Sequence, residues 1–221
     1  MNRPRSGFIR RPTLLILIAA LAAGLGLWTA QRALHGGASS QPQLAITRLL
    51  PEPRALPPFT LRSGADAALG NADLQGRWTL VFIGFTHCPD VCPTTLGEMA
   101  AAEKLWNVAL PPEQRPRILY VSVDPERDSP EHTQQYARFF SPDAIGATGE
   151  LPALEAFARS LGMVFMKVPP AEGQDPANYS IDHSAQITLL DPQGRFAGLI
   201  RPPHAPADLA SDLIAIVQRT P

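Results

Sequence analysis

Residues 79–96 read TLVFIGFTHCPDVCPTTL and join a continuous apolar run to two cysteines and a proline. The run Thr79–Gly84 is typical of a central strand that is covered on both faces of a sheet. Pro93 suits the first turn of a helix, and apolar residues at three-residue spacing continue that helix to about Trp106. The stretch therefore predicts a buried strand that leads through a short loop into a helix.

The chain beyond this unit alternates between strand patterns and helix patterns. Its apolar runs predict strands, and its amphipathic stretches that begin at proline predict helices. The predicted strands are Ile118–Val123, Met163–Val168, Ala185–Leu190 and Phe196–Ile200, and the predicted helices are Pro130–Phe140, Pro152–Leu161 and Pro206–Gln218. This order predicts an α/β domain with a mixed central sheet flanked by helices, which is consistent with a thioredoxin-like fold.

The N-terminal segment predicts one transmembrane helix. Residues 13–30 carry no charge, and as a helix they would span about 27 Å, close to the thickness of a bilayer core. Residues 1–12 carry four arginines and no acid, so the positive-inside rule places them in the cytoplasm. A cleaved signal peptide is the alternative, and it also places the rest of the chain outside the cytoplasm. Because the leader is so short, we expect the bacterial inner membrane, with the C-terminal domain in the periplasm.

A proline-rich segment divides the membrane helix from the predicted domain. Residues 31–56 mix Gly, Ser and Pro without sustained periodicity and are predicted to be a tether, and residues 57–221 are predicted to form the domain. Outside the N-terminal arginines, 15 basic residues stand against 20 acidic ones. This balance excludes a chain-wide basic face for nucleic acid. Two cysteines also cannot form a disulfide framework or a four-cysteine zinc site.

The two cysteines, Cys88 and Cys92, lie between the predicted strand and helix. A helix N-terminus favours thiolate over thiol, and a spacing of four residues places both sulfurs on one face of a turn. A disulfide across so short a loop constrains little of the unfolded chain, so a structural staple explains the pair poorly. Ligation of a soft metal and thiol–disulfide exchange remain. Two sulfurs leave a metal under-coordinated, and His183, in a turn before a predicted strand, is the candidate third ligand.

Three motifs in this chain together resemble the Sco/SenC family. They are Phe85–Leu96 (FTHCPDVCPTTL), Val121–Pro130 (VSVDPERDSP) and Asp182–Ser184 (DHS). The resemblance extends from about Pro57 to Gln218, with the apolar segment ahead of it. A pair of cysteines alone would be weak evidence, but three motifs in the same order argue against accidental similarity.

The resemblance implies a thioredoxin-like fold that binds copper through Cys88, Cys92 and His183. Members of the family assist assembly of the binuclear copper centre of cytochrome c oxidase, as copper donors, as thiol reductants, or both. The implied partner is therefore the copper-centre subunit of the oxidase, with other copper chaperones or thiol reductants as further candidates. The expected metal is Cu(I), with Cu(II) left open, and Cys88 and Cys92 would also form a redox-active disulfide. The resemblance thus implies a metallochaperone rather than an enzyme, with no catalytic residues assigned and with thiol–disulfide reductase activity left open.

Three aspartates are candidates for supporting this site or for docking a partner. Asp182 adjoins the histidine and is expected to orient the loop or the imidazole, with a simple backbone turn as the alternative. Asp124 and Asp128 lie in a stretch that reads first as a turn followed by a helix cap, in which Asp128 or Ser129 caps the helix that Pro130 begins. In the second interpretation, one of these two aspartates lies beside the cysteine loop and tunes its charge or docks a partner.

The competing hypothesis is a membrane-anchored thiol–disulfide oxidoreductase or peroxidase of the cell envelope. Thioredoxin-type catalysis normally uses two residues between the cysteines, and here three residues separate Cys88 from Cys92. The discriminating residue is His183, because copper delivery by this site needs it whereas disulfide exchange does not.

Overall fold

The computed structural model describes residues 11–35 and 43–219, which form two compact units. The first unit contains helix α1, Arg11–His35, whose apolar stretch Thr13–Gln31 is long and apolar enough to cross a membrane. The predicted anchor lies within this helix. Residues 1–10, which include most of the predicted cytoplasmic segment, lie outside the described residues.

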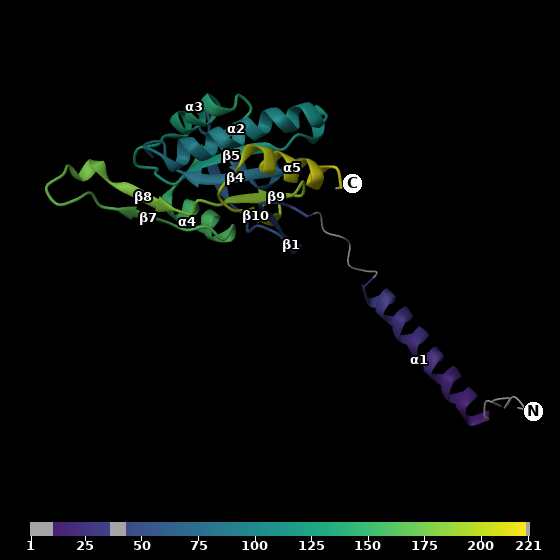
Figure 1. The fold of residues 1–221 in the computed structure, drawn as a ribbon. Helices are drawn as coiled ribbons and strands as arrows, with labels where there is room; N and C mark the ends of the chain where they lie inside the picture. The colour runs from purple at the N-terminus through teal and green to yellow at the C-terminus, as the bar shows by residue number, and fades with distance from the viewer. Residues whose placement is uncertain (1–10, 36–42, 220–221) are drawn as a thin grey trace, which may run out of the picture. The chain divides into compact units, whose positions relative to one another are not determined.

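The second unit is built on an eight-stranded sheet with the order β1-β10-β9-β4-β5-β6-β2-β3 (Figure 1). Strands β4, β5 and β6 are parallel, whereas β9 is antiparallel to β4, so the sheet is mixed, as the sequence predicts. Its strands are β1 Thr47–Arg54, β2 Thr60–Ser63, β3 Ala67–Gly70, β4 Thr79–Gly84, β5 Arg117–Ser122, β6 Ile145–Thr148, β9 Ile187–Leu190 and β10 Phe196–Ile200. All six residues of β4 are buried, which explains its uninterrupted apolar sequence.

Four helices cover the sheet. They are α2 Val91–Ala109, α3 Pro130–Phe140, α4 Leu151–Ser160 and α5 Pro206–Val217, and short 3-10 helices η1 Asn71–Leu74, η2 Pro112–Gln114 and η3 Pro176–Asn178 lie in the connections. The crossovers from β4 to β5 and from β5 to β6 run in the same direction, so right-handed connections place α2 and α3 on one face. Helix α5 packs against α2 on that face, and α4 lies on the other side of the sheet (Figure 1).

The predicted boundary between tether and domain is wrong. The predicted tether, residues 31–56, contains the whole of β1, which pairs antiparallel with β10, so the domain begins at Leu44. The prolines Pro51 and Pro53 concealed this strand because proline cannot donate to a sheet ladder. The strand lies at the edge of the sheet and is irregular at this point, and edges and bulges are where proline is tolerated. Residues 36–42 of the same segment lie outside the described residues.

A separate two-stranded sheet projects from the domain. Strand β7, Phe165–Val168, pairs antiparallel with β8, Ser180–His183, and Figure 1 shows this hairpin extending away from the main sheet. The sequence predicts β7, although with two more residues at its start, but it places His183 in a turn. In the structure His183 ends a strand and pairs with Phe165.

Candidate metal centre

The two cysteines lie where β4 passes into α2, at the carboxyl end of a central strand. This end of parallel strands is where α/β folds commonly bind ligands. Cys88 is half-buried in the connecting loop, and Cys92 is buried in the first turn of α2. The backbone N–H of Cys92 donates a hydrogen bond to Cys88 Sγ at 3.4 Å. Both cysteines are free thiols in the structure.

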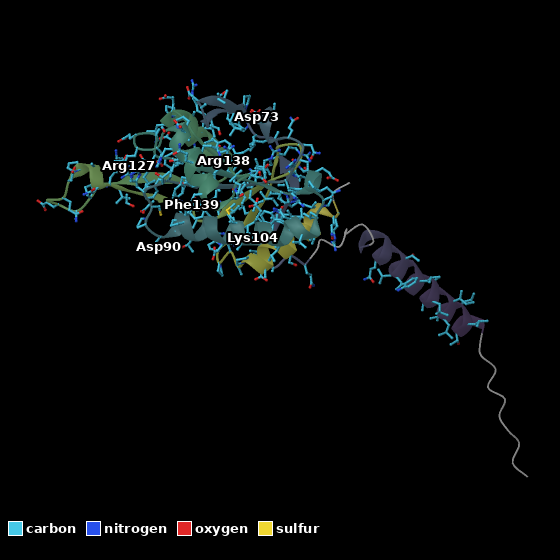
Figure 2. All side chains as sticks on the ribbon, turned by 90° about the horizontal axis from the view of Figure 1, so that it is seen from above. Asp73, Asp90, Lys104, Arg127, Arg138 and Phe139 are labelled. Carbon is cyan, nitrogen blue, oxygen red and sulfur yellow. The ribbon has the colours of Figure 1, made fainter. Side chains whose placement is uncertain are left out.

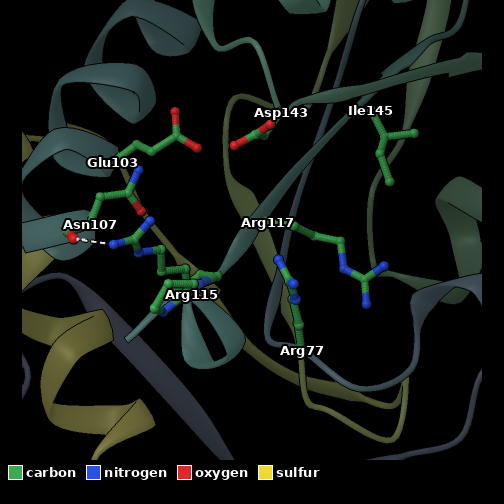
Figure 3. Close-up of a pocket in the computed structure, with 9 residues that line it drawn as sticks. Arg77, Glu103, Asn107, Arg115, Arg117, Asp143 and Ile145 are labelled. Carbon is green, nitrogen blue, oxygen red and sulfur yellow. Dashed lines mark hydrogen bonds between the residues drawn. The ribbon is translucent and has the colours of Figure 1, made fainter. Parts of the chain in front are cut away.

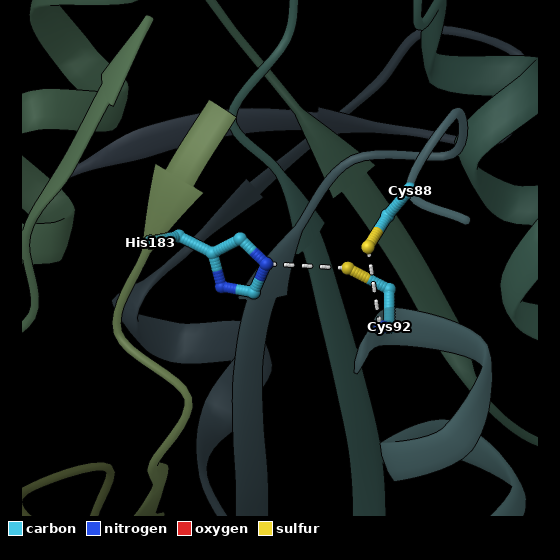
Figure 4. A group of neighbouring side chains, drawn as sticks. All are labelled: Cys88, Cys92 and His183. Atoms are coloured by element: carbon cyan, nitrogen blue, oxygen red, sulfur yellow. Dashed lines mark hydrogen bonds between the residues drawn. The ribbon is translucent and has the colours of Figure 1, made fainter. Parts of the chain in front are cut away.

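His183 faces the cysteine pair from the end of β8. Its Nε2 atom lies 3.3 Å from Cys92 Sγ, and Figure 4 shows the imidazole directed at that sulfur. One ligand atom from each of Cys88, Cys92 and His183 lies within 4.8 Å of the others. The structure therefore brings together the three residues that the sequence singles out, from a loop, a helix and a strand.

The environment of His183 leaves Nε2 as the nitrogen that could accept a metal. Nδ1 lies 3.2 Å from the backbone carbonyl oxygen of Ser184, so the proton of a neutral imidazole belongs on Nδ1 and the lone pair on Nε2. Burial lowers the pKa of His183, which keeps the ring neutral at neutral pH. The predicted orienting group, Asp182, is exposed on β8, and its charge acts on the pKa of His183 in the opposite direction. The Ser184 carbonyl, rather than Asp182, is the group that orients the imidazole.

The buried sulfur of Cys92 is a protonated thiol in the metal-free protein. Burial raises its pKa well above the ordinary value, and a charge on Cys88 would raise it further. The backbone N–H of Phe85 and the hydroxyl of Tyr120 act in the opposite direction, but burial outweighs them. A metal bound here would displace the proton, because the ligand of a soft metal is the thiolate.

Asp128 ties the cysteine loop to the end of β5. Its carboxylate is 1% exposed and accepts hydrogen bonds from the backbone N–H of Thr86 at 2.8 Å and from the hydroxyls of Thr86 and Ser122. The helix cap is Ser129, one of the two predicted candidates, whose hydroxyl accepts from the backbone N–H of His132. For Asp128, the structure thus supports the interpretation that places it beside the cysteine loop, because the carboxylate is buried against that loop.

Asp124 connects the same turn to the projecting hairpin. Its buried carboxylate accepts hydrogen bonds from the hydroxyl of Tyr179 at 2.7 Å and from Nε of Arg127. The Arg127 guanidinium lies over the Tyr179 ring, 3.6 Å from its centroid, and donates to the Tyr179 carbonyl oxygen. Figure 2 shows Arg127 on the side of the domain from which the hairpin projects. Since Tyr179 directly precedes β8, Asp124 acts on the strand that carries His183.

The sequence alone does not identify the partners of His183, Asp124 and Asp128. Thr86 and Ser122 lie inside the two longer motifs, each just after or at the end of an apolar strand. A polar residue at such a position only weakly indicates a side chain that forms a hydrogen bond with a neighbouring loop. Tyr179 and Ser184 flank β8, and although Ser184 belongs to the third motif, no local pattern shows which group either residue contacts. Their roles depend on which strand ends meet in space.

A cavity at the opposite end of β4 and β5 has a different chemistry. It encloses about 450 Å³, and Figure 3 shows the guanidinium groups of Arg77 and Arg117 on one side and the carboxylates of Glu103 and Asp143 on the other. Arg117 donates hydrogen bonds to backbone carbonyls of the neighbouring loop, which fixes its side chain. None of the described residues that line this cavity offers a sulfur or an imidazole, so this lining does not suit a soft metal.

Comparison with known proteins agrees with this architecture. The family model described as SCO1/SenC matches residues 48–218. A candidate copper-binding protein of Stutzerimonas stutzeri is 37% identical over 157 residues, which cover 70% of this chain and 73% of that protein. The mitochondrial SCO2 homolog of Bos taurus is 34% identical over 187 residues, covering 83% and 67% of the two chains. The structure of Bradyrhizobium japonicum ScoI with copper bound is 34% identical with a TM-score of 0.61, and the match covers 72% of this chain and 98% of that one.

Fold and site together define a class of proteins in which a thioredoxin-like domain presents a cysteine pair, on a strand–helix junction, to a histidine from a distant strand. The family match covers well over half of the chain, and the relatives match over most of their own length. This chain belongs to the SCO1/SenC family.

Proposed function

We propose that this protein is a membrane-anchored copper chaperone that binds copper through Cys88, Cys92 and His183. The observation that carries the proposal is the convergence of two sulfurs and one imidazole nitrogen within 4.8 Å. Copper is the cargo of such a protein, and a site with two thiolates and one imidazole suits Cu(I). Three protein ligands leave room for an incoming ligand, so that copper can be handed to a partner by ligand exchange.

The proposed client is the subunit of cytochrome c oxidase that holds the binuclear copper centre. Membership of the SCO1/SenC family supports this assignment, together with copper-bound ScoI as a structural relative. The same cysteine pair could serve the client as a reductant. In that step Cys88 and Cys92 form a disulfide and give two electrons and two protons to a disulfide of the client, which becomes two thiols. A site oxidised in this way cannot ligate copper, so copper loading and redox state are linked.

The proposed location is the bacterial inner membrane, with the domain in the periplasm. Helix α1 supports an anchor, since its stretch Thr13–Gln31 has the length and hydropathy of a membrane span. The arginines at the N-terminus support the orientation.

The test is an anaerobic titration of the reduced protein with Cu(I) against a competing chelator. We expect one copper per chain in the wild type, binding weakened at least tenfold in His183→Ala, and no tight binding when both cysteines are changed to serine. Asp182→Asn is the matched control, because it changes the exposed neighbour of the histidine without removing a ligand. Copper binding that ignores His183 would contradict the proposed site.

The second candidate function is thiol–disulfide exchange without copper. The proximity of the two sulfurs favours it, since Cys88 Sγ already accepts a hydrogen bond from the Cys92 backbone. A protein that reduces a disulfide substrate equally well with and without His183, and that holds copper only weakly, would establish this function instead.

A further inference from the structure

The hydroxyl of Tyr120 is an unpaired donor beside the candidate copper site. Tyr120 lies in β5 and is fully buried, and its hydroxyl oxygen has no hydrogen-bond partner among the residues that the structure describes. Buried polar groups are nearly always paired because an unpaired one loses its hydration without compensation. The position of this hydroxyl therefore requires an explanation.

The geometry around Gly84 shows what the hydroxyl faces. A Cβ atom placed on Gly84 would lie 2.5 Å from Cys92 Sγ and 3.2 Å from the Tyr120 hydroxyl oxygen. The sulfur and the hydroxyl thus converge over the same residue of β4, and only glycine leaves room for both. Glycine at position 84 is therefore required for this arrangement, because any side chain there would displace the Cys92 sulfur and the Tyr120 hydroxyl.

Other acceptors near the phenol are already occupied or unsuitable. Asp128, the nearby carboxylate, accepts three hydrogen bonds from Thr86 and Ser122. Tyr136 presents its ring to the ring of Tyr120, with centroids 5.4 Å apart. Among the described residues, Cys92 offers an acceptor, its sulfur, that converges with the hydroxyl over Gly84.

We infer that the Tyr120 hydroxyl donates a hydrogen bond to Cys92 Sγ when that sulfur is a metal-bound thiolate, and that it thereby tunes the metal–sulfur bond. A thiol is a weak acceptor whereas a thiolate is a strong one, which explains why the donor has no partner in the metal-free protein. Hydrogen bonds around a ligating cysteine sulfur are known to adjust the potential of the metal. Tyr120 is a positioning residue that acts through Cys92, and the inference rests on the proposed copper site.

The test compares Tyr120→Phe with the wild type in the full chain in detergent micelles. The variant removes one oxygen atom and keeps the buried ring, so the fold is retained. Because a thiolate accepts a stronger hydrogen bond than a thiol, the contact favours the loaded state, and we expect Tyr120→Phe to weaken Cu(I) binding by about tenfold. We also expect the sulfur-to-Cu(II) charge-transfer band to move to lower energy, since a thiolate without its donor gives up an electron more easily. Tyr136→Phe is the matched control, which makes the same change one ring away and should alter neither quantity.

An unchanged band and an unchanged Cu(I) affinity in Tyr120→Phe would overturn the inference, as would equal shifts in Tyr136→Phe. A parallel titration with Cd²⁺, whose thiolate complexes absorb in the ultraviolet, separates this result from a failure of the proposed function. If the wild type fails to hold Cu(I), the copper-chaperone proposal is wrong. The Cd²⁺–thiolate band would still report on Tyr120, and the same band in Tyr120→Phe and in the wild type would overturn the inference.

Discussion

The site has a cysteine half, Cys88 and Cys92, and a histidine half, His183, and different parts of the fold hold the two halves in place. The cysteines follow β4, which has hydrogen-bonded neighbours on both sides, and Cys92 is packed into the hydrophobic core. His183 ends a two-stranded sheet that lies apart from the main one. The core therefore positions the cysteines, whereas the histidine touches the core through the rings of Phe82 and Phe85 and depends further on side-chain contacts at the base of the hairpin.

One turn supplies both halves of the site with a buried carboxylate. Asp128 accepts hydrogen bonds from the cysteine loop, and Asp124 accepts from Tyr179 at the start of β8 and from Arg127. The relative position of the sulfurs and the imidazole therefore depends on this turn as well as on the contact between Cys92 Sγ and His183 Nε2. Each carboxylate should then affect one half of the site and leave the other half in place.

The largest effect is expected for Asp128→Asn. The amide cannot accept all three hydrogen bonds that the carboxylate accepts, so donors of Thr86 or Ser122 lose their partner in a buried place. We expect a loss of about 3 kcal/mol in the free energy of unfolding, together with weaker Cu(I) binding. Urea unfolding of the domain measures the first effect. Asp90→Asn is the control, since it changes an exposed carboxylate in the same loop and should cost well under 1 kcal/mol.

An intermediate effect is expected for Asp124→Asn. The amide oxygen can still accept from Tyr179, and Arg127 keeps a backbone carbonyl as partner, so we expect a loss of about 1.5 kcal/mol in the free energy of unfolding. Cu(I) affinity should fall several-fold, because the strand that carries His183 is less firmly held.

A double-mutant cycle with His183→Ala sharpens this prediction. In that background Asp124→Asn should have little further effect on Cu(I) affinity, whereas Asp128→Asn should still lower it. Equal behaviour of the two aspartate variants would show that the turn supports the site as one unit, and the division into two halves would be wrong.

The same division separates what the sequence predicts from what it does not. The cysteine half lies in one continuous stretch, so the apolar run, the helix-starting proline and the cysteine spacing predict β4, α2 and both sulfurs together. The motif resemblance adds His183, but β8 has only four residues and its single buried residue gives no recognisable period. Thr86 lies 42 residues from Asp128, and Tyr179 lies 55 residues from Asp124, so no local pattern encodes these two contacts.

The edge of the sheet shows a second limit of local patterns. Strand β1 contains two prolines and reads as a tether, yet three consecutive backbone N–H groups just before and at its start donate to the carboxylate of Asp212 on α5. This contact spans more than 160 residues. A long-range polar contact and pairing with β10 outweigh the poor strand propensity of the segment.

The smallest effect is expected for Lys167→Gln at the surface of the hairpin. Lys167 Nζ lies 2.6 Å from the Glu126 carboxylate and 3.7 Å from the centroid of the Tyr179 ring, so it contacts the same turn as Arg127 but from the solvent side. Exposed ion pairs contribute little because water and salt screen them, and we expect Cu(I) affinity to change by less than about twofold. Chelator competition at low and high salt measures this, and the small difference should vanish at high salt. A loss as large as that of Asp124→Asn would mean that the hairpin is held from its surface, and the buried carboxylate would then not be what positions the histidine.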